Sequence, residues 1–265
     1  MVADLQSFSL EGKVAIVTAA GQGIGKGVAL GFARAGASVS LADINPETLE
    51  TTGSEIRQMS RDELTVAADI TKENEIARLV KQTVDKFGRI DILANVVGGY
   101  PFEHRGKAIE LSEESFDVLF ALNLKSTFLC SRAVARVMID QEIKGSIINT
   151  GSISGMGWYP SGSPYGVAKS GIMHLTKSLA AEWAPFGIRV NTISPGYIDT
   201  PGGRRVFTAF KLDREGLIKK IPLKRIGQPE DIANTAVFLA SDASSYITAV
   251  TIVVSGGLEA MIFSL

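Results

Sequence analysis

The chain has 265 residues, of which 45% are hydrophobic and 21% charged, and its formal net charge is −1. This composition predicts a globular protein with a sizeable core, and the balanced charge gives no electrostatic footprint for nucleic acid or an anionic membrane. The single cysteine, Cys130, excludes an internal disulfide, and the two distant histidines, His104 and His174, form no metal-ligand cluster.

The N-terminal residues MVADLQSFSLEGK lack the basic start and apolar core of a signal peptide. No uninterrupted apolar run approaches the length of a membrane span. We therefore expect a cytoplasmic protein whose partners are small molecules, with no nucleic acid, no membrane and no metal.

Short β-branched runs alternate along the chain with longer stretches whose apolar residues recur at helical spacing. GIGKGVALGFARAG and NEIARLVKQTVDKFG are two such stretches, ended by Gly36 and Gly88. The continuous apolar runs are typical of parallel strands covered by helices on both faces. The alternation predicts one α/β domain over residues 1–265, a Rossmann-like doubly wound parallel sheet of about seven strands that binds ligands beyond the strands' carboxyl ends. The predicted strands are Val14–Thr18, Ser38–Asp43, Leu64–Asp69, Ile90–Val97, Ser146–Thr150, Arg189–Ser194 and Val250–Val254.

Two segments do not fit the alternation, residues 98–107 and residues 197–227. Each follows a predicted strand, so we expect both at the carboxyl edge of the sheet. The second is predicted to be partly helical and to close over a substrate as a lid. Its Arg204, Arg205 and Lys211 leave two interpretations open, contact with an anionic substrate or a solvated charged face.

The stretch TAAGQGIGKG follows the first predicted strand. A strand-to-helix turn offers free backbone N–H groups and the positive end of a helix dipole, which suit a pyrophosphate. Gly23 and Gly25 would let phosphates approach the backbone. The spacing matches neither G-x-G-x-x-G nor the phosphate loop that ends in G-K-[ST], so a plain turn that needs glycine for tightness stays an alternative.

Tyr165 and Lys169 lie four residues apart in SPYGVAKSGIMHLTKSLAAEW, and so on one face of a predicted helix. A phenol with the usual pKa of about 10 is a poor base at neutral pH, but an adjacent ammonium favours the phenolate. The pair therefore predicts proton exchange between Tyr165 and an alcohol or ketone. An ordinary surface contact is the alternative.

These motifs resemble those of the short-chain dehydrogenase/reductase family over nearly the whole chain. The family's T-G-x-x-x-G-x-G loop matches Thr18, Gly23 and Gly25, with Gly21 as an additional glycine. Ala19 replaces the first glycine of the motif, which predicts ordinary backbone angles at that position.

The family's catalytic set matches Asn123, Ser152, Tyr165 and Lys169. The resemblance implies that Tyr165 is the general acid/base, that Ser152 polarises the substrate oxygen, and that Lys169 also binds the nicotinamide ribose. Asn123 would hold a water that passes protons onward through Lys169. The alternatives are that Ser152 merely caps a turn and that Asn123 is an ordinary helix amide.

The resemblance also implies a nicotinamide dinucleotide. In SPGYIDT the backbone of Ile198 and the hydroxyl of Thr200 would bind the carboxamide, and Asp69 would contact adenine or, alternatively, cap a helix. The family's N-N-A-G appears as Asn95-Val96-Val97-Gly98. The predicted cofactor residues are Thr18, Gly21, Gln22, Gly23, Ile24, Gly25, Asp43, Asp69, Ile70, Asn95, Gly98, Tyr165, Lys169, Pro195, Gly196, Ile198 and Thr200.

Asp43 ends the second predicted strand, about twenty residues after the glycine turn, where a carboxylate bonds the ribose hydroxyls of NAD. It would repel the 2′-phosphate of NADP, and neither Gln22 nor Ile44 offers a compensating cation. The sequence therefore predicts NAD, with a solvated turn aspartate as the alternative.

We predict an NAD-dependent oxidoreductase that interconverts a secondary alcohol and a ketone. Two alternatives stay open: a 3-oxoacyl thioester reductase, against which Asp43 counts, and a dinucleotide-binding sensor without catalysis, against which the intact catalytic set counts. The predicted substrate contacts are Ser152, Met156, Tyr159, Tyr165 and Tyr197, with Trp158 as a further pocket wall. Cys130 is expected in the core, and the resemblance implies a homotetramer that pairs through the helices carrying Asn123 and Tyr165.

Overall fold

The computed structural model describes residues 5–157, 162–209, 211 and 213–261. Seven strands form one parallel sheet in the order β3-β2-β1-β4-β5-β6-β7. The order reverses between β1 and β4, so the ligand crevice of this topology lies beyond the carboxyl ends of those two strands. The predicted doubly wound α/β fold is confirmed. The strands are β1 Val14–Thr18, β2 Ser38–Asp43, β3 Glu63–Ala67, β4 Ile92–Asn95, β5 Ser146–Thr150, β6 Arg189–Pro195 and β7 Thr251–Val254.

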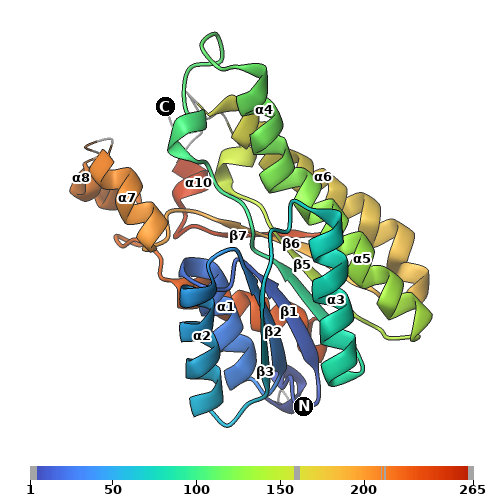
Figure 1. The fold of residues 1–265 in the computed structure, drawn as a ribbon. Coiled ribbons are helices and arrows are strands. Elements are labelled where there is room, and N and C mark those ends of the chain that lie inside the picture. Colours follow the sequence, from blue (N-terminus) through green and yellow to red (C-terminus); the bar gives the residue numbers. More distant parts are fainter. Residues whose placement is uncertain (1–4, 158–161, 210, 212, 262–265) are drawn as a thin grey trace.

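Helices cover both faces of this sheet (Figure 1). Residues of α1, α2 and α9 pack on one face, and residues of α3, α5 and α6 pack on the other. The helices are α1 Gly23–Arg34, α2 Pro46–Gln58, α3 Glu73–Phe87, α4 Glu113–Phe120, α5 Ser126–Asp140, α6 Ser163–Trp183, α7 Pro201–Ala209, α8 Arg214–Lys220, α9 Pro229–Ala240 and α10 Leu258–Met261.

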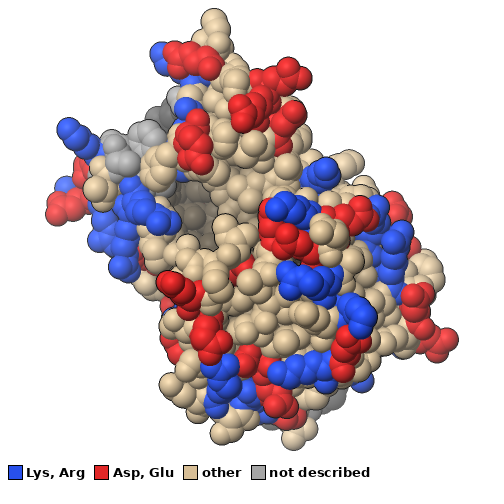
Figure 2. Space-filling model, in the orientation of Figure 1, with Lys and Arg blue, Asp and Glu red and all other residues tan. Residues whose placement is uncertain are grey.

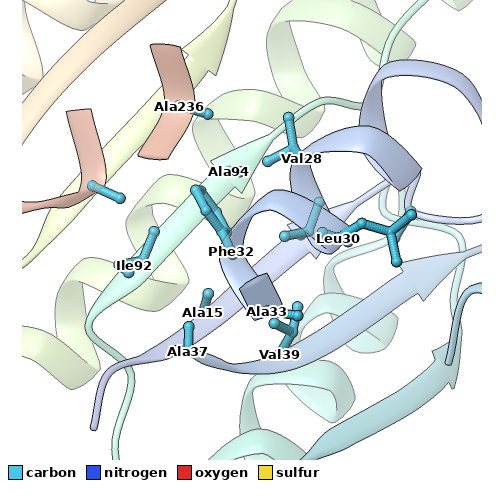
Figure 3. Packing of buried hydrophobic residues seen from close by; sticks show 14 of the residues in the cluster. Ala15, Val28, Leu30, Phe32, Ala33, Ala37, Val39, Ile92, Ala94 and Ala236 are labelled. Carbon is cyan, nitrogen blue, oxygen red and sulfur yellow. The ribbon is translucent and has the colours of Figure 1, made fainter. Parts of the chain in front are cut away.

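Each helical layer encloses its own hydrophobic core. In the first, Phe32 of α1 and Ala236 of α9 lie near Ile92 of β4 (Figure 3). In the second, Val134 of α5 packs with residues of α3, α6 and the sheet, and Cys130 lies there as predicted. Because both faces of each central strand are buried, the strands read as continuous apolar runs.

The fourth strand is shorter than predicted. Residues 90–97 read as one apolar run, yet β4 spans only Ile92–Asn95. The backbone N–H groups of Val96 and Val97 donate to the Thr18 hydroxyl oxygen, at 2.9 and 3.1 Å, instead of continuing the ladder. The chain therefore leaves the sheet at Val96 and turns toward the glycine turn.

A π-helical turn, Ala121–Lys125, joins α4 to α5. The continuous helix Glu113–Asp140 is long and apolar enough, by length and composition, to cross a membrane. Half of its most apolar window is buried inside the protein, where Leu129 and Met138 belong to the second core. Core helices of this kind pass the same test.

Candidate active site

The predicted site residues lie along the carboxyl ends of β1 to β6, with the catalytic candidates near β4 and β5 and the Asp43 and Asp69 carboxylates at β2 and β3. Residues 197–227, predicted to be partly helical, contain α7 and α8, which project from the body beside this edge (Figure 1). The molecular surface is hollowed between that segment and the rest of the protein (Figure 2). The arrangement follows from the parallel sheet, because all strand ends of one polarity meet at the same edge.

The glycine turn fits a pyrophosphate. The N-cap residue of α1, Gln22, makes no side-chain capping hydrogen bond, so its side chain does not occupy the amides that open the helix. A Cβ on Gly25 would lie 1.9 Å from the carbonyl oxygen of Ala19, so only glycine fits there. A Cβ on Gly23 would lie 3.3 Å from Thr200, which shows that the turn and the segment after β6 adjoin each other.

The prediction of ordinary backbone angles at Ala19 is wrong. Its φ is +53°, in the left-handed region where the glycine of the family motif carries no Cβ penalty. The next residue, Ala20, donates its N–H to Ala42 of β2 at 3.0 Å, and Gly25 packs against the Ala19 carbonyl. These contacts hold the turn in a conformation that disfavours alanine by roughly 1–2 kcal/mol.

Two predicted cofactor residues direct their side chains into the protein. The Thr18 hydroxyl accepts the N–H of Val96, as described above. The Asn95 amide is fully buried and donates to Ser131 Oγ and Asn149 Oδ1, both at 2.9 Å. These bonds join the glycine turn, β4, β5 and α5. Because the side chains of Thr18 and Asn95 make them, we expect these two residues to contact a cofactor through their backbone atoms.

Asp43 lies at the end of β2 beside the glycine turn. Its Oδ2 accepts the N–H of Gly21 at 3.0 Å, and its Oδ1 accepts the N–H of Asn45 at 3.0 Å. The neighbouring Ile44 side chain is 75% exposed. The carboxylate is thus held against the turn, in the position from which ribose hydroxyls are bound in this fold.

Asp69 follows β3 and accepts hydrogen bonds from the N–H and the hydroxyl of Thr71, at 3.0 and 2.7 Å. Burial opposes its ionisation, but the Thr71 bonds and the Lys72 ammonium at 3.2 Å outweigh burial and hold its pKa below the usual value. The N-cap of α3 is Lys72, so the alternative of a helix-capping Asp69 is wrong. The next residue, Ile70, is buried and has only its backbone to offer a cofactor.

Three elements bring the catalytic candidates together. Tyr165 and Lys169 lie one turn apart on α6, with the Lys169 Nζ 5.8 Å from the centre of the Tyr165 ring. Lys169 is 3% exposed and donates to the carbonyl oxygen of Thr150, at the end of β5, at 2.9 Å. Ser152 lies in the turn after β5, and Asn123 lies in the π-helical turn before α5.

Burial lowers the pKa of Lys169 from its usual 10.5 to about 7. The ammonium that favours the Tyr165 phenolate is therefore itself close to titration at neutral pH. An ionised phenol would favour the ammonium in turn, so we expect the two groups to titrate as a coupled pair.

Ser152 and Asn123 also have structural roles, as their alternative interpretations predicted. Ser152 Oγ accepts the N–H of Ser154 at 3.1 Å and caps a short 3-10 helix, an acceptor role that leaves its O–H to donate. The Asn123 amide accepts the N–H of Gly99 and donates to the Gly99 carbonyl oxygen, both at 3.0 Å. Asn123 therefore clamps the loop after β4, a role that no sequence spacing signals, while its water-holding role stays a prediction.

The predicted substrate contacts fall into three groups. Tyr197 packs on Phe207 of α7, with ring centres 5.9 Å apart, in a small apolar cluster formed mostly by residues 197–227, the predicted lid, which we call the lid segment. Met156 is 42% exposed near Ser152. Trp158 and Tyr159 lie outside the described residues.

The basic residues of the lid segment do not share one environment. Arg204 and Arg214 both pair with Asp199, at 2.6 and 3.2 Å, which neutralises part of their charge. Arg205 and Lys211 are exposed. The ion pairs with Asp199, which the spacing did not suggest, weaken the case for Arg204 as a substrate contact.

A dinucleotide-type parallel sheet with a glycine turn, and with Tyr165 beside the buried Lys169 at its carboxyl edge, is the arrangement of a nicotinamide-dependent oxidoreductase. A family model described as enoyl-(acyl carrier protein) reductase matches residues 18–259. The chain is 39% identical to 2-dehydro-3-deoxy-D-gluconate 5-dehydrogenase of Escherichia coli, covering 96% of this chain and 98% of the relative. It is 37% identical to the 3-oxoacyl-[acyl-carrier-protein] reductase FabG of Thermotoga maritima, over 94% of this chain and 98% of the relative.

Among solved structures, 7α-hydroxysteroid dehydrogenase complexed with NADH and 7-oxo glycochenodeoxycholic acid superposes with a TM-score of 0.89. It is 34% identical, over 96% of this chain and 97% of that one. The chain belongs to the short-chain dehydrogenase/reductase family, whose members are oxidoreductases that bind a nicotinamide dinucleotide.

Proposed function

We propose that the protein is an NAD-dependent oxidoreductase that interconverts a secondary alcohol and a ketone, with Tyr165 as general acid/base. The observation that carries this proposal is the buried Lys169 against Tyr165, beside the Ser152 hydroxyl at the same sheet edge. When bound, the dinucleotide supplies or accepts the hydride. A single buried cysteine supports the expected cytoplasmic location.

The chain's own residues then move the proton. In alcohol oxidation the Ser152 O–H donates to the substrate oxygen and orients it, and the Tyr165 phenolate takes the hydroxyl proton. The Lys169 ammonium stabilises the phenolate before this transfer. In ketone reduction the Tyr165 phenol returns the proton to the same oxygen.

Three parts of the site would hold the cofactor. The amides of the glycine turn and of the α1 N-terminus suit the pyrophosphate, and Asp43 suits the adenosine ribose. The Thr200 hydroxyl accepts the N–H of Gly203 at 3.0 Å, which leaves its O–H to donate to the carboxamide oxygen.

Asp43→Ala is expected to reduce the preference for NADH over NADPH at least about tenfold, because the variant no longer repels the 2′-phosphate. Fluorescence titration of wild type and variant with both reduced cofactors measures the ratio. Asp62→Ala, an exposed carboxylate at the opposite end of the sheet, serves as the matched control. Tighter binding of NADPH than of NADH by the wild type would contradict the assignment of Asp43.

A screen of secondary alcohols and ketones, including polyols, sugar acids and cyclic alcohols, tests the function through formation or loss of reduced nicotinamide. The second candidate, 3-oxoacyl thioester reduction, is supported by the similarity to FabG. A 3-oxoacyl-CoA, assayed with NADH and NADPH, separates the two candidates. Cofactor binding without turnover of any compound would favour the non-catalytic sensor.

We also propose a homotetramer. An apolar groove of about 820 Å³ runs between the α4–α5 helix and α6, where Phe120, Leu124 and Leu175 are among the lining residues. Phe128, which also lines it, is 38% exposed, and such an apolar face is stabilised by a second copy.

Light scattering is expected to give the mass of a tetramer for the wild type and a smaller mass for Leu124→Arg, because an arginine in the groove would be buried without a partner. Thr51→Lys, on the exposed face of α2, is the control and should leave the mass unchanged. A monomeric wild type at micromolar concentration would contradict the proposed assembly.

A further inference from the structure

The loop after β4 places a second aromatic ring on the catalytic tyrosine. The Tyr100 and Tyr165 rings lie with their centres 5.4 Å apart and their planes 8° from parallel. This is the geometry of an offset stack, which is favoured between aromatic rings beyond the area they bury. Tyr100 therefore restricts the plane in which the Tyr165 ring lies.

The loop itself is held by residues of the site. Asn123 clamps Gly99, immediately before Tyr100, through two hydrogen bonds of 3.0 Å. Gly98 has a φ of +145°, and a Cβ there would lie 2.7 Å from Asn123 Oδ1 and 2.8 Å from Lys169 Nζ. The backbone thus approaches the site so closely that glycine is required, and this approach brings Tyr100 to Tyr165.

Arg105 secures Tyr100 from the other end of the loop. Its Nε donates to the Tyr100 carbonyl oxygen at 2.8 Å. Its guanidinium carbon lies 4.4 Å from the centre of the Tyr100 ring and 4.9 Å from that of Phe102. Arginine keeps its charge at every relevant pH and stacks well on aromatic faces.

Three successive contacts link four side chains, Lys169 to Tyr165, Tyr165 to Tyr100 and Tyr100 to Arg105, and we call this linked set the column. A cation lies at each end and two phenols are stacked between them. We propose that Tyr100 and Arg105 are positioning residues for Tyr165. Tyr100 fixes the plane of the catalytic ring, and Arg105 fixes Tyr100 and adds a second positive charge that favours the Tyr165 phenolate. This inference rests on the proposed function only for the role of Tyr165 as the base.

The charge of Arg105 matters because burial weakens the first cation, Lys169. A charge separated from the phenol by one stacked ring in a partly buried site shifts the phenol's pKa by roughly half to one unit. The other charged or basic groups of the loop are placed differently: His104 Nδ1 lies 3.1 Å from Ser115 Oγ of α4, and the Glu103 and Lys107 side chains are exposed. Ser152 and Asn123, which complete the site, carry no charge.

A titration that needs no substrate tests the column. The difference in ultraviolet tyrosinate absorbance between the protein and its Tyr165→Phe variant, both carrying Tyr100→Phe so that the neighbouring phenol does not contribute, follows the ionisation of Tyr165. In the Arg105→Gln background we expect this ionisation to move up by about half to one pH unit, and in the Arg105→Lys background by less. Arg61→Gln, which removes a partly buried cation that pairs with Glu11 far from the site, is the control.

Steady-state kinetics test the stacking of Tyr100 on Tyr165, with the substrate that the screen identifies. Tyr100→Leu should lower kcat about tenfold with little change in NADH affinity, and Tyr100→Phe, which retains the ring, should restore most of that loss. Thermal melting verifies that each variant is folded.

An unchanged Tyr165 titration in Arg105→Gln, or equal kcat for Tyr100→Leu and the wild type, would overturn the proposal. So would a rise in KM confined to anionic substrates in Arg105→Gln with no shift in titration, since Arg105 would then be a substrate contact. A shifted titration in a protein that turns over no alcohol or ketone would uphold the column and refute the proposed function.

Discussion

Replacing Tyr165 by phenylalanine is expected to lower kcat by about a hundredfold or more while NADH affinity changes little. The variant loses the oxygen that accepts the alcohol proton, but it retains the ring that stacks on Tyr100 and leaves the glycine turn untouched. Steady-state turnover and NADH titration by fluorescence measure the two effects separately.

The pH profile of the wild type provides a second readout. The rate of alcohol oxidation should rise through an apparent pKa well below that of free tyrosine, about 10, and this value belongs to the coupled Tyr165–Lys169 pair. Phenylalanine at position 165 should abolish the rise. Turnover of the variant close to that of the wild type would mean that another group takes the proton.

Replacing Lys169 by methionine, which has a similar volume, is expected to reduce activity and increase stability. Activity should fall about a hundredfold or more, because the Tyr165 phenolate loses its nearest cation, and NADH binding should weaken if Lys169 also contacts the ribose. Lys169 is only 3% exposed, so removing its charge from the protein interior should stabilise the folded state.

The sign of the pH dependence follows from the lowered pKa of Lys169. In the folded protein this pKa is about 7, below the usual 10.5, so the unfolded chain binds more protons between these values. The free energy of unfolding of the wild type should therefore rise with pH across that window relative to the variant. Below pH 7 the free energy of unfolding of the methionine variant should exceed that of the wild type by no more than a few kcal/mol, because the variant also loses the bond to Thr150. This difference shrinks as the pH rises.

Urea unfolding of both proteins at about pH 6 and about pH 9 measures this difference. Lys177→Met, an exposed lysine on the same helix, is the matched control and should show no such pH dependence. A methionine variant that is less stable than the wild type at the lower pH would show that the buried ammonium is net stabilising.

The sequence alone determined the fold class and the location of the site. Apolar runs alternating with helical periodicity required a parallel sheet covered on both faces, and such a sheet brings the turns after its strands to one edge. Likewise, a spacing of four residues on a helix is enough to put Tyr165 and Lys169 on one face. These features depend on neighbours along the chain, so they can be read without knowing how the elements pack.

The features that join distant segments depend on how the elements pack against one another. The left-handed backbone of Ala19 is imposed by contacts with β2 and Gly25, and the pairing of Asp199 with Arg204 and Arg214 depends on how the lid segment folds back. The stack of Tyr100 on Tyr165 likewise requires that the loop after β4 meet α6. No local pattern encodes these contacts, because each depends on the packed positions of residues that lie far apart in the chain or belong to different elements.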